Sequence, residues 1–353
     1  MRETLLEQTE VFVGGEGGYH TYRIPAVVGA PGGAVLAFCE GRKAGAADMG
    51  DIDVVLRRSF DQGRTWEPPQ LIWDDGANTC GNPCPVVDRA TVTIWLLLTH
   101  NLGADREDAI INGTSQSTRT VWVTKSTDEG ATWSKPVEIT ADAKRPDWTW
   151  YATGPGAGIQ MWNGRLVVPC DHVEAASKEG YSHVIYSDDH GRSWRLGGSA
   201  GPKTNECQVV ELASGALLLN MRNYRSDDTR RATATSDDGG LSWSAVSHDP
   251  ALIEPICQAS IRRYSASAES PIFFSNPASR RREKMTIRLS SDQGHTWPVA
   301  RTLESGPAAY SDLVVLPDGT IGCLYERGAK NPYEKITFAR FSLEWLLAGK
   351  EPG

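Results

Sequence analysis

The chain lacks the sequence features of several large classes of protein. Its 353 residues contain no run of Lys and Arg, and acidic residues outnumber basic ones, which gives a formal net charge of −8. Nucleic acids and anionic membranes attract clustered positive charge, so we expect no nucleic-acid partner. No segment reaches the roughly 20 consecutive apolar residues that cross a bilayer, so we expect no membrane span.

Neither the N-terminus nor the cysteines show a recognisable targeting, disulfide or metal-binding pattern. Residues 1–8 lack the apolar core of a secretory signal peptide. We therefore expect either a cytoplasmic protein or a secreted or periplasmic one whose signal has been removed. The seven cysteines are odd in number and irregularly spaced, which predicts buried free thiols rather than disulfides or a zinc site. We expect no metal and no other cofactor.

What the sequence has instead is a repeated turn. Five segments, which we call boxes, share the pattern Ser-x-Asp-x-Gly-x-Ser/Thr-Trp: residues 59–66, 126–133, 187–194, 236–243 and 290–297. We expect the Asp side chain to accept hydrogen bonds from backbone N–H groups two residues on, Gly to supply a positive φ, and Trp to pack against the turn. Five copies indicate a repeat protein, with the boxes as structural turns rather than catalytic motifs.

The segments around the boxes predict an all-β fold. Each box joins two extended segments as a hairpin turn, and a more apolar hairpin, present six times, lies upstream. Two hairpins give four antiparallel strands, so we predict a six-bladed β-propeller, one domain over residues 1–353. The N-terminal strand, residues 7–13, should close the ring against residues 335–340. A short helix is expected at about residues 342–348.

In such a propeller one face should hold the functional pocket. The starts of the first strands and the ends of the second strands converge there on the central channel. Arg23, Arg42 and Arg222 occupy these positions, and Arg282 lies in a loop between a second and a third strand on the same face. A guanidinium grips a carboxylate in a planar fork that Lys cannot copy, which suggests a small anionic ligand. The alternative for each arginine is an ion pair with a neighbouring Asp or Glu on the rim.

Several segments resemble the exo-α-sialidase (neuraminidase) family of bacterial and animal type. They are the boxes, Tyr-Arg-Ile-Pro at residues 22–25, Thr-Asn-Glu-Cys-Gln at 204–208 and Ala-Tyr-Ser-Asp at 309–312. The resemblance implies that the propeller is a catalytic domain and that the protein is a retaining exo-α-sialidase. Such an enzyme removes terminal α-linked sialic acids from glycans through a covalent tyrosyl–glycosyl intermediate. Its partner would be a sialylated glycan or oligosaccharide; the oligomeric state is not predicted.

The resemblance also assigns the residues that would hold the substrate carboxylate. They match the arginine triad of the family and one further arginine near it: Arg23, Arg222, Arg282 and Arg42. Arg280 and Arg281 adjoin Arg282 and compete with it. We prefer Arg282 because its distance ahead of residues 286–289 matches the family pattern.

The catalytic residues are assigned in the same way. The nucleophile matches Tyr310 and its partner carboxylate matches Glu206. A neutral phenol suits an anomeric carbon that already bears a carboxylate, because an anionic nucleophile would be repelled. The alternatives are a core tyrosine and an ordinary capped glutamate. The acid/base matches Asp48, with Asp51 as a competitor in the same loop.

Further candidates for contacts to the sugar lie around the rim. They are Asn82, Asp51, Trp148, Tyr151 and His172, and Trp150 shares the loop of the aromatic ones. The aromatic residues could instead pack their loop. Two other functions stay open: hydrolysis of a related nonulosonic acid such as Kdn, and non-catalytic binding of sialic acid. Linkage preference, and hydrolysis as against transfer or release of an anhydro sugar, are not predicted.

Overall fold

The strands of this chain are apolar on both faces, and this fixes how they pack. In β2 (Thr21–Gly29) and β3 (Val35–Arg42) nearly every residue is buried. Alternate residues of a strand point to opposite faces. Val27 and Val35 accordingly join one apolar cluster, whereas Val28 and Leu36 join another. Apolar side chains therefore cover these two strands on both faces.

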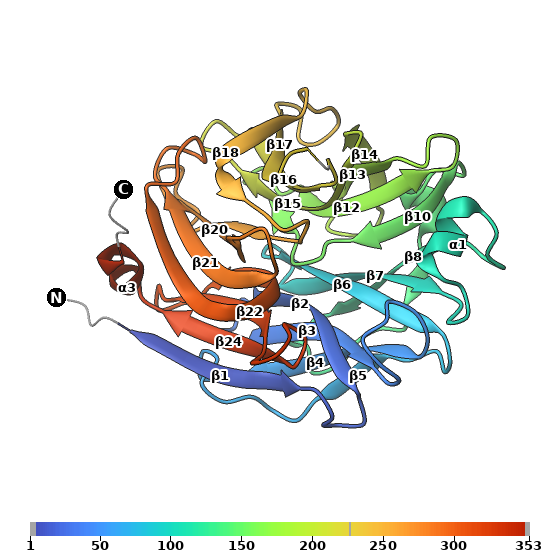
Figure 1. Cartoon of the computed structure of the whole chain (residues 1–353), viewed down its shortest axis with the longest axis horizontal. Helices are drawn as coiled ribbons and strands as arrows, with labels where there is room; N and C mark the ends of the chain where they lie inside the picture. The colour runs from blue at the N-terminus through green and yellow to red at the C-terminus, as the bar shows by residue number, and fades with distance from the viewer. Residues whose placement is uncertain (1–4, 226, 350–353) are drawn as a thin grey trace.

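A computed structural model describes residues 5–225 and 227–349; residues 1–4, part of the N-terminal segment considered above, lie outside the described residues. The fold is all-β as predicted, with three short helices in the described ranges. In Figure 1 the colours run around the molecule in chain order, from blue through green and yellow to red. No described helix combines the length and the apolar character that crossing a membrane requires.

Hydrogen bonding groups the strands into four sheets. The first has eight strands: β2, β3, β4 (Ile52–Ser59), β5 (Gln70–Trp73), β6 (Thr79–Asp88), β7 (Thr93–Asn101), β8 (Thr120–Ser126) and β9 (Val137–Glu138). The second has five: β10 (Trp148–Thr153), β11 (Ile159–Gln160), β12 (Leu166–Glu174), β13 (Gly180–Ser187) and β14 (Arg195–Ala200). The third has four: β15 (Thr204–Glu211), β16 (Leu217–Asn223), β17 (Arg230–Ser236) and β18 (Ser247–Ile253). The fourth has seven: β19 (Ser260–Arg263), β20 (Ile272–Pro277), β21 (Glu283–Ser290), β22 (Val299–Val315), β23 (Ile321–Arg327), β24 (Lys335–Phe341) and β1 (Leu6–Val13).

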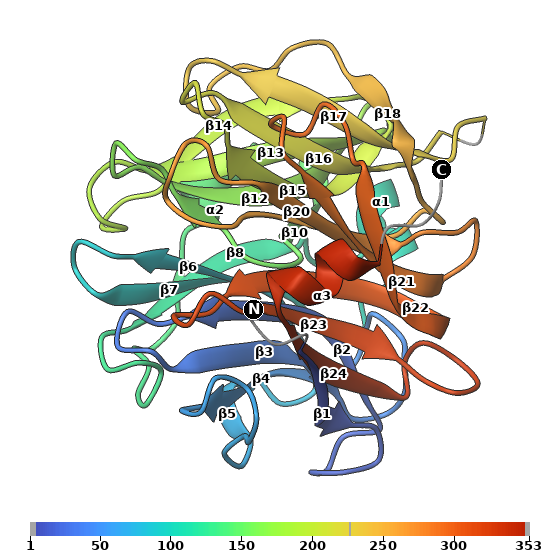
Figure 2. The same ribbon diagram turned by 90° about the vertical axis from the view of Figure 1, so that its left-hand side faces the viewer.

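This grouping differs from six separate four-stranded sheets at two places. One parallel bridge, between Ile52 and Thr79, joins β4 to β6. The long strand β22 pairs with β21 in its first half and with β23 in its second half. The number of blades therefore stays a prediction. The predicted pairing of residues 7–13 with residues 335–340 is confirmed, because β1 lies antiparallel to β24, side by side in Figure 2.

Three helices complete the fold. The predicted C-terminal helix is present as α3 (Leu343–Ala348), on the outside of the sheets. The hydroxyl of Ser342 caps it by accepting a hydrogen bond from the N–H of Trp345 at 3.1 Å. Two short helices that the sequence does not predict, α1 (Glu107–Asn112) and α2 (Thr140–Ala143), interrupt loops. All seven cysteines are free and buried, as expected.

The boxes are hairpin turns, but their hydrogen bonding differs from the expectation. In the first box the hydroxyl of Ser59 accepts from the N–H of Gly63 and donates to Asp61, each at 2.8 Å. Asp61 accepts from the N–H and hydroxyl of Thr65 at 2.9 and 2.6 Å. It also accepts from the N–H of Arg64 at 3.0 Å, so its partners lie three and four residues on, not two, because Gln62 and Gly63 both have positive φ and turn the chain back.

Candidate active site

The site is built where four inner strands depart from regular pairing. The register of hydrogen bonding shifts near the start of each of β2, β6 and β15, and where β22 begins to pair with β23. Each shift contains or borders one residue that the sequence predicts: Arg23, Asn82, Glu206 or Tyr310. A bulge re-aims side chains that a regular strand would direct into the neighbouring sheets. The four irregularities therefore accompany polar groups that face one cavity.

These side chains meet in one cavity of about 140 Å³. Eight of the predicted residues line it: Arg23, Arg42, Asp48, Asn82, Glu206, Arg222, Arg282 and Tyr310. No residue of the five boxes does. The predicted residues Asp51, Trp148, Tyr151 and His172 are not part of its lining.

Tyr310 and Glu206 are in direct contact. The phenol donates to Glu206 Oε1 at 2.5 Å, and Arg222 Nη1 donates to Glu206 Oε2 at 2.7 Å and to the phenol oxygen at 3.0 Å. Burial first, and then the charge of Glu206, raise the pKa of Tyr310 well above its ordinary value, although Arg222 opposes them. The phenol is therefore neutral, and its proton already faces a carboxylate that can accept it.

A buried carboxylate behind the cavity holds the neighbouring arginine. Glu326, which the sequence analysis missed, accepts from Arg23 Nε at 2.9 Å. It also accepts from the backbone N–H groups of Ile24 and Tyr310 at 3.0 and 3.1 Å. One carboxylate thus orients both a guanidinium and the backbone that carries the phenol.

The third arginine of the predicted triad carries a charge that no carboxylate neutralises. Arg282 Nη1 donates to the hydroxyl of Tyr333 at 2.7 Å, and within residues 5–225 and 227–349 Arg282 forms no ion pair. Its guanidinium lies 5.5 Å from the ring centre of Tyr310, and that of Arg23 lies 5.1 Å from it. Positive charge therefore surrounds the phenol, and an anion would be stabilised there.

Asp48, rather than Asp51, reaches the cavity. Arg42 Nη2 lies 2.6 Å from an Asp48 oxygen, and Arg23 Nη1 lies 3.9 Å from it. Burial disfavours the charged form of Asp48, but Arg42 and Arg23 outweigh this effect and lower its pKa. The side chain is still 57% exposed, so it borders the open side of the cavity. Asp51 instead binds Lys43 at 2.9 Å.

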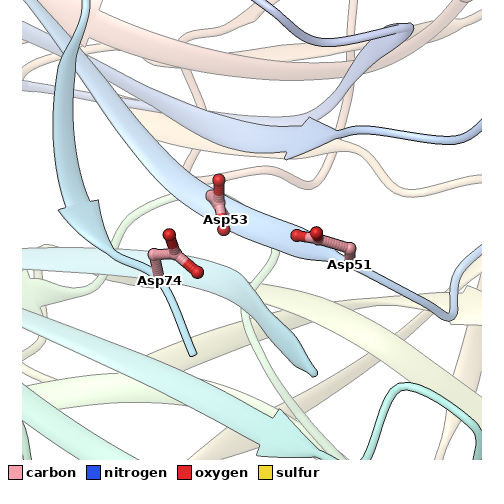
Figure 3. A group of neighbouring side chains, drawn as sticks. All are labelled: Asp51, Asp53 and Asp74. Carbon is pink, nitrogen blue, oxygen red and sulfur yellow. The ribbon is translucent and has the colours of Figure 1, made fainter. Parts of the chain in front are cut away.

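Asp51 belongs to a group of three carboxylates beside the loop that carries Asp48 (Figure 3). Oxygens of Asp51, Asp53 and Asp74 lie within 4.8 Å of one another. The ammonium of Lys43 lies 2.9 Å from Asp51 and 3.1 Å from Asp53, and the N–H of Lys43 donates to the carbonyl of Asp51 at 3.1 Å. Since Lys43 already supplies a cation to these oxygens, we interpret the group as the anchor of the Asp48 loop.

The three aromatic candidates away from the cavity pack together instead. Trp148 stacks on His172 with ring centres 3.4 Å apart, and His172 Nδ1 lies 3.0 Å from His183 Nδ1. Burial lowers the pKa of His172 to about 3, so the imidazole is neutral. Tyr151 is fully buried. Trp148 and Tyr151, on β10, and His172, on β12, thus pack within the fold.

Other cavity residues were missed or left without a role. Arg119 lies with its guanidinium 4.1 Å from the ring centre of Trp150, and its Nε is buried without a hydrogen-bond partner in the described ranges. Glu107 comes from α1. Asp171, whose pKa is raised well above the ordinary value by burial, accepts from Asn205 at 2.9 Å. Asp171 lies near the end of β12, a second strand, where the sequence already places it toward the pocket but gives it no role.

Known proteins resemble this chain along most of its length. The BNR repeat-like domain family matches residues 33–323. A sialidase of Micromonospora viridifaciens is 37% identical over 98% of this chain, which spans 55% of that relative's length. An exo-alpha-sialidase of Aspergillus fumigatus is 33% identical over 94% of this chain and 86% of the relative. The chain belongs to the sialidase family.

The solved structures agree with this membership. The Hadza microbial sialidase Hz136 superposes with a TM-score of 0.87 at 32% identity, covering 96% of this chain and 69% of that one. The resemblance drawn from the boxes and the three short segments is confirmed. Sialidases are glycoside hydrolases, so this chain belongs to an enzyme family rather than to a class of pure binding modules.

Proposed function

We propose that this chain is a retaining exo-α-sialidase that hydrolyses terminal α-linked sialic acids of glycoconjugates. The observation that carries the proposal is the phenol of Tyr310, held 2.5 Å from Glu206 and surrounded by guanidinium groups. A binding module needs cations for the sugar carboxylate, but it does not need a phenol bonded to a proton acceptor. We also propose that residues 1–353 form a single six-bladed β-propeller.

In the first step the substrate carboxylate binds Arg23, Arg222 and Arg282. Glu206 accepts the phenol proton while Tyr310 Oη attacks the anomeric carbon. The glycosidic C–O bond breaks, and the leaving oxygen takes a proton from Asp48. The sugar is then bound covalently to Tyr310.

In the second step water replaces the phenol. Asp48, now ionised, accepts a proton from the water that attacks the anomeric carbon. The bond to Tyr310 Oη breaks, and Glu206 returns its proton to the departing phenolate. Two displacements at one carbon retain its configuration.

Asp48 must be protonated to act first, yet its pKa is low in the free protein because Arg42 and Arg23 lie beside it. A substrate carboxylate that binds Arg23 would neutralise part of this positive charge. We infer that substrate binding raises the pKa of Asp48 and so prepares the acid.

The test compares Tyr310→Phe with Tyr224→Phe, a second phenol of the cavity. With a fluorogenic aryl α-sialoside we expect Tyr310→Phe to lower kcat by about 10³-fold or more, and Tyr224→Phe to have a much smaller effect. Binding of 2-deoxy-2,3-dehydro sialic acid should persist in both variants. Full activity of Tyr310→Phe contradicts the mechanism. If the natural chain binds the sialic acid analogue but does not hydrolyse the aryl sialoside, a non-catalytic binding protein is favoured. If it hydrolyses the aryl Kdn glycoside faster than the aryl sialoside, Kdn is the preferred substrate.

A further inference from the structure

A second and larger cavity, of about 470 Å³, lies at the other ends of the same inner strands. On β15 the catalytic cavity touches Glu206 and the second cavity touches Val210; on β22 the two residues are Tyr310 and Val314. Four residues of strand span about 13 Å. The two cavities share no lining residue. The second cavity is therefore a separate space that substrate in the first does not reach.

The walls of this second cavity are apolar. They are formed by the last residues of inner strands from all four sheets, among them Val27, Val87, Val210, Ile261 and Val314. Trp162 also lines the cavity and is 43% exposed. A volume near 470 Å³ falls within the range of small-molecule sites, roughly 300–1,000 Å³. A ligand here would bury an apolar body.

Two arginines that line this cavity, Arg89 and Arg262, have no carboxylate within ion-pair distance among the described residues, although Glu211 and Asp312 lie near enough to act on their charge. Arg262 Nε donates to the carbonyl of Leu313 at 3.1 Å, and its Nη1 approaches the carbonyl of Gly158 at 3.5 Å. The side chain of Arg89 is exposed at the same cavity. Within residues 5–225 and 227–349 neither Arg89 nor Arg262 forms an ion pair.

The acidic groups nearby are already engaged. Glu211 accepts the N–H of Trp162 at 2.8 Å, and Asp312 accepts the N–H of Val27 at 2.8 Å and the hydroxyl of Ser260 at 2.9 Å. Burial lowers the pKa of Arg262; Asp312 opposes this effect and Arg89 adds to it. The positive charges of Arg89 and Arg262 thus repel one another. They form a local positive region in a protein whose net charge is −8.

Arg263, the remaining arginine of this cavity, has its N–H groups bonded within the protein and so is not free to bind a ligand. Arg263 Nε donates to the carbonyl of Glu211, its Nη1 to the carbonyls of Ala268 and Ser270, and its Nη2 to Gln293. Its N–H groups are thus taken up by the wall, so Arg89 and Arg262 are the arginines left to donate to a ligand.

We propose that this cavity binds a small organic anion with an apolar body. Its anionic head would lie between the guanidinium groups of Arg89 and Arg262, and its body against the valine walls and Trp162. The head would gain charge-assisted hydrogen bonds, and the body would leave water. The two requirements together exclude both a simple inorganic anion and a neutral apolar molecule as the preferred ligand.

The experiment is calorimetric titration of the full chain with four probes. Octanoate has both an anionic head and an apolar body, whereas 1-octanol has only the apolar body. Octyltrimethylammonium has an apolar body with a positive head, and sodium sulfate supplies an anion without an apolar body. We expect one octanoate per chain, bound at least about tenfold more tightly than any other probe, a difference of roughly 1.4 kcal/mol. Equal binding of octanol, or of sulfate, overturns the proposal.

Two variants locate the site by different means. Arg89→Gln removes an exposed charge and should weaken octanoate about tenfold. Gly29→Leu fills the cavity without changing charge; a Cβ there meets Val314 and Val315 at ordinary distances of 3.8 and 3.9 Å, so the chain should still fold. Arg192→Gln, an exposed arginine outside both cavities, is the matched control and should bind octanoate normally.

All three variants should hydrolyse the aryl sialoside like the natural chain, because none alters the catalytic cavity. If Arg89→Gln and Gly29→Leu bind octanoate as tightly as Arg192→Gln does, the ligand lies elsewhere and the proposal is wrong. The binding measurement needs no catalysis, so its result is independent of the proposed activity.

Discussion

At the scale of single residues, the protonation of Asp48 decides whether the proposed mechanism can begin. Arg42 and Arg23 favour its carboxylate form in the free protein, against the effect of burial. An acid catalyst must hold its proton at the working pH. In the proposed mechanism these arginines thus disfavour the protonated form of Asp48 until the substrate carboxylate has bound Arg23.

This predicts two different pH profiles. In kcat/KM, which reports the free enzyme, activity should fall as the pH rises through the low pKa of Asp48. In kcat, which reports the complex, the same fall should occur at higher pH, because bound substrate offsets the charge of Arg23. Initial rates over pH 3–8 with an aryl α-sialoside measure both limbs. Coincident limbs would show that substrate does not alter this pKa.

Lys43 provides a second prediction at this scale. Its ammonium binds Asp51 and Asp53, which follow Asp48 closely in the chain. Lys43→Met keeps the length but leaves the carboxylates to repel, so the loop should shift and kcat should fall by about ten- to a hundredfold. The limb of the pH profile that reports Asp48 should move with it. Lys43→Arg, which keeps the charge, should restore much of kcat and of the original pH profile. If Lys43→Arg loses as much as Lys43→Met does, the substitutions destabilise the protein generally.

The sequence could predict Tyr310, Glu206 and Arg23 because each stands at the start of an inner strand within a recognisable segment. It could not separate Trp148 from Trp150. Both lie on β10, but the register of β10 shifts between Trp148 and Tyr151, and a bulge breaks the alternation from which orientation is inferred. Arg119 and Glu107 follow irregular loops, where no periodicity places a side chain.

At the scale of elements, the boxes show a turn whose presence was predictable and whose contacts were not. Their glycines have positive φ, as expected; Gly191, for example, has φ of 80°. The sequence does not reveal that this glycine lies against Trp95, because the two are far apart in the chain. A Cβ at position 191 would come within 2.2 Å of that ring.

We therefore predict that Gly191→Ala destabilises the protein by about 2–4 kcal/mol, from left-handed strain and overpacking together. Gly215→Ala is the matched control. Its φ of 87° brings similar strain, but nothing lies within 4 Å of its Cβ, so only about 1 kcal/mol is expected. Thermal unfolding of the two variants side by side measures the difference. Equal Tm values would mean that the turn moves away from Trp95 freely.

At the scale of the whole molecule, the chain's two ends share one sheet and one core. β1 pairs with β24, and Phe12 is buried in a cluster with Val27 and Phe338. The sequence predicted this pairing, because the sixth unit lacked a final strand. It did not predict that hydrogen bonds would merge neighbouring units into four sheets, since that depends on one bridge and on the continuous path of β22.

Phe12→Ala should therefore destabilise the entire protein rather than fray one strand. The expected loss is about 3–5 kcal/mol, visible as a lower Tm and as faster aggregation of the unpaired edge of β24. Phe60→Ala removes an equal side chain that is 59% exposed, and should change Tm little. Similar Tm values for both variants would show that β1 contributes little to the fold.

Glu326 has a consequence for synthesis. It binds Arg23, a residue 303 positions earlier in the chain, and the backbone of Tyr310. While the polypeptide emerges from the ribosome, the codons up to position 326 must be translated before the buried counter-ion of that arginine exists. A nascent chain released before this point has no assembled sugar pocket, so prematurely terminated products would be unable to compete for glycans.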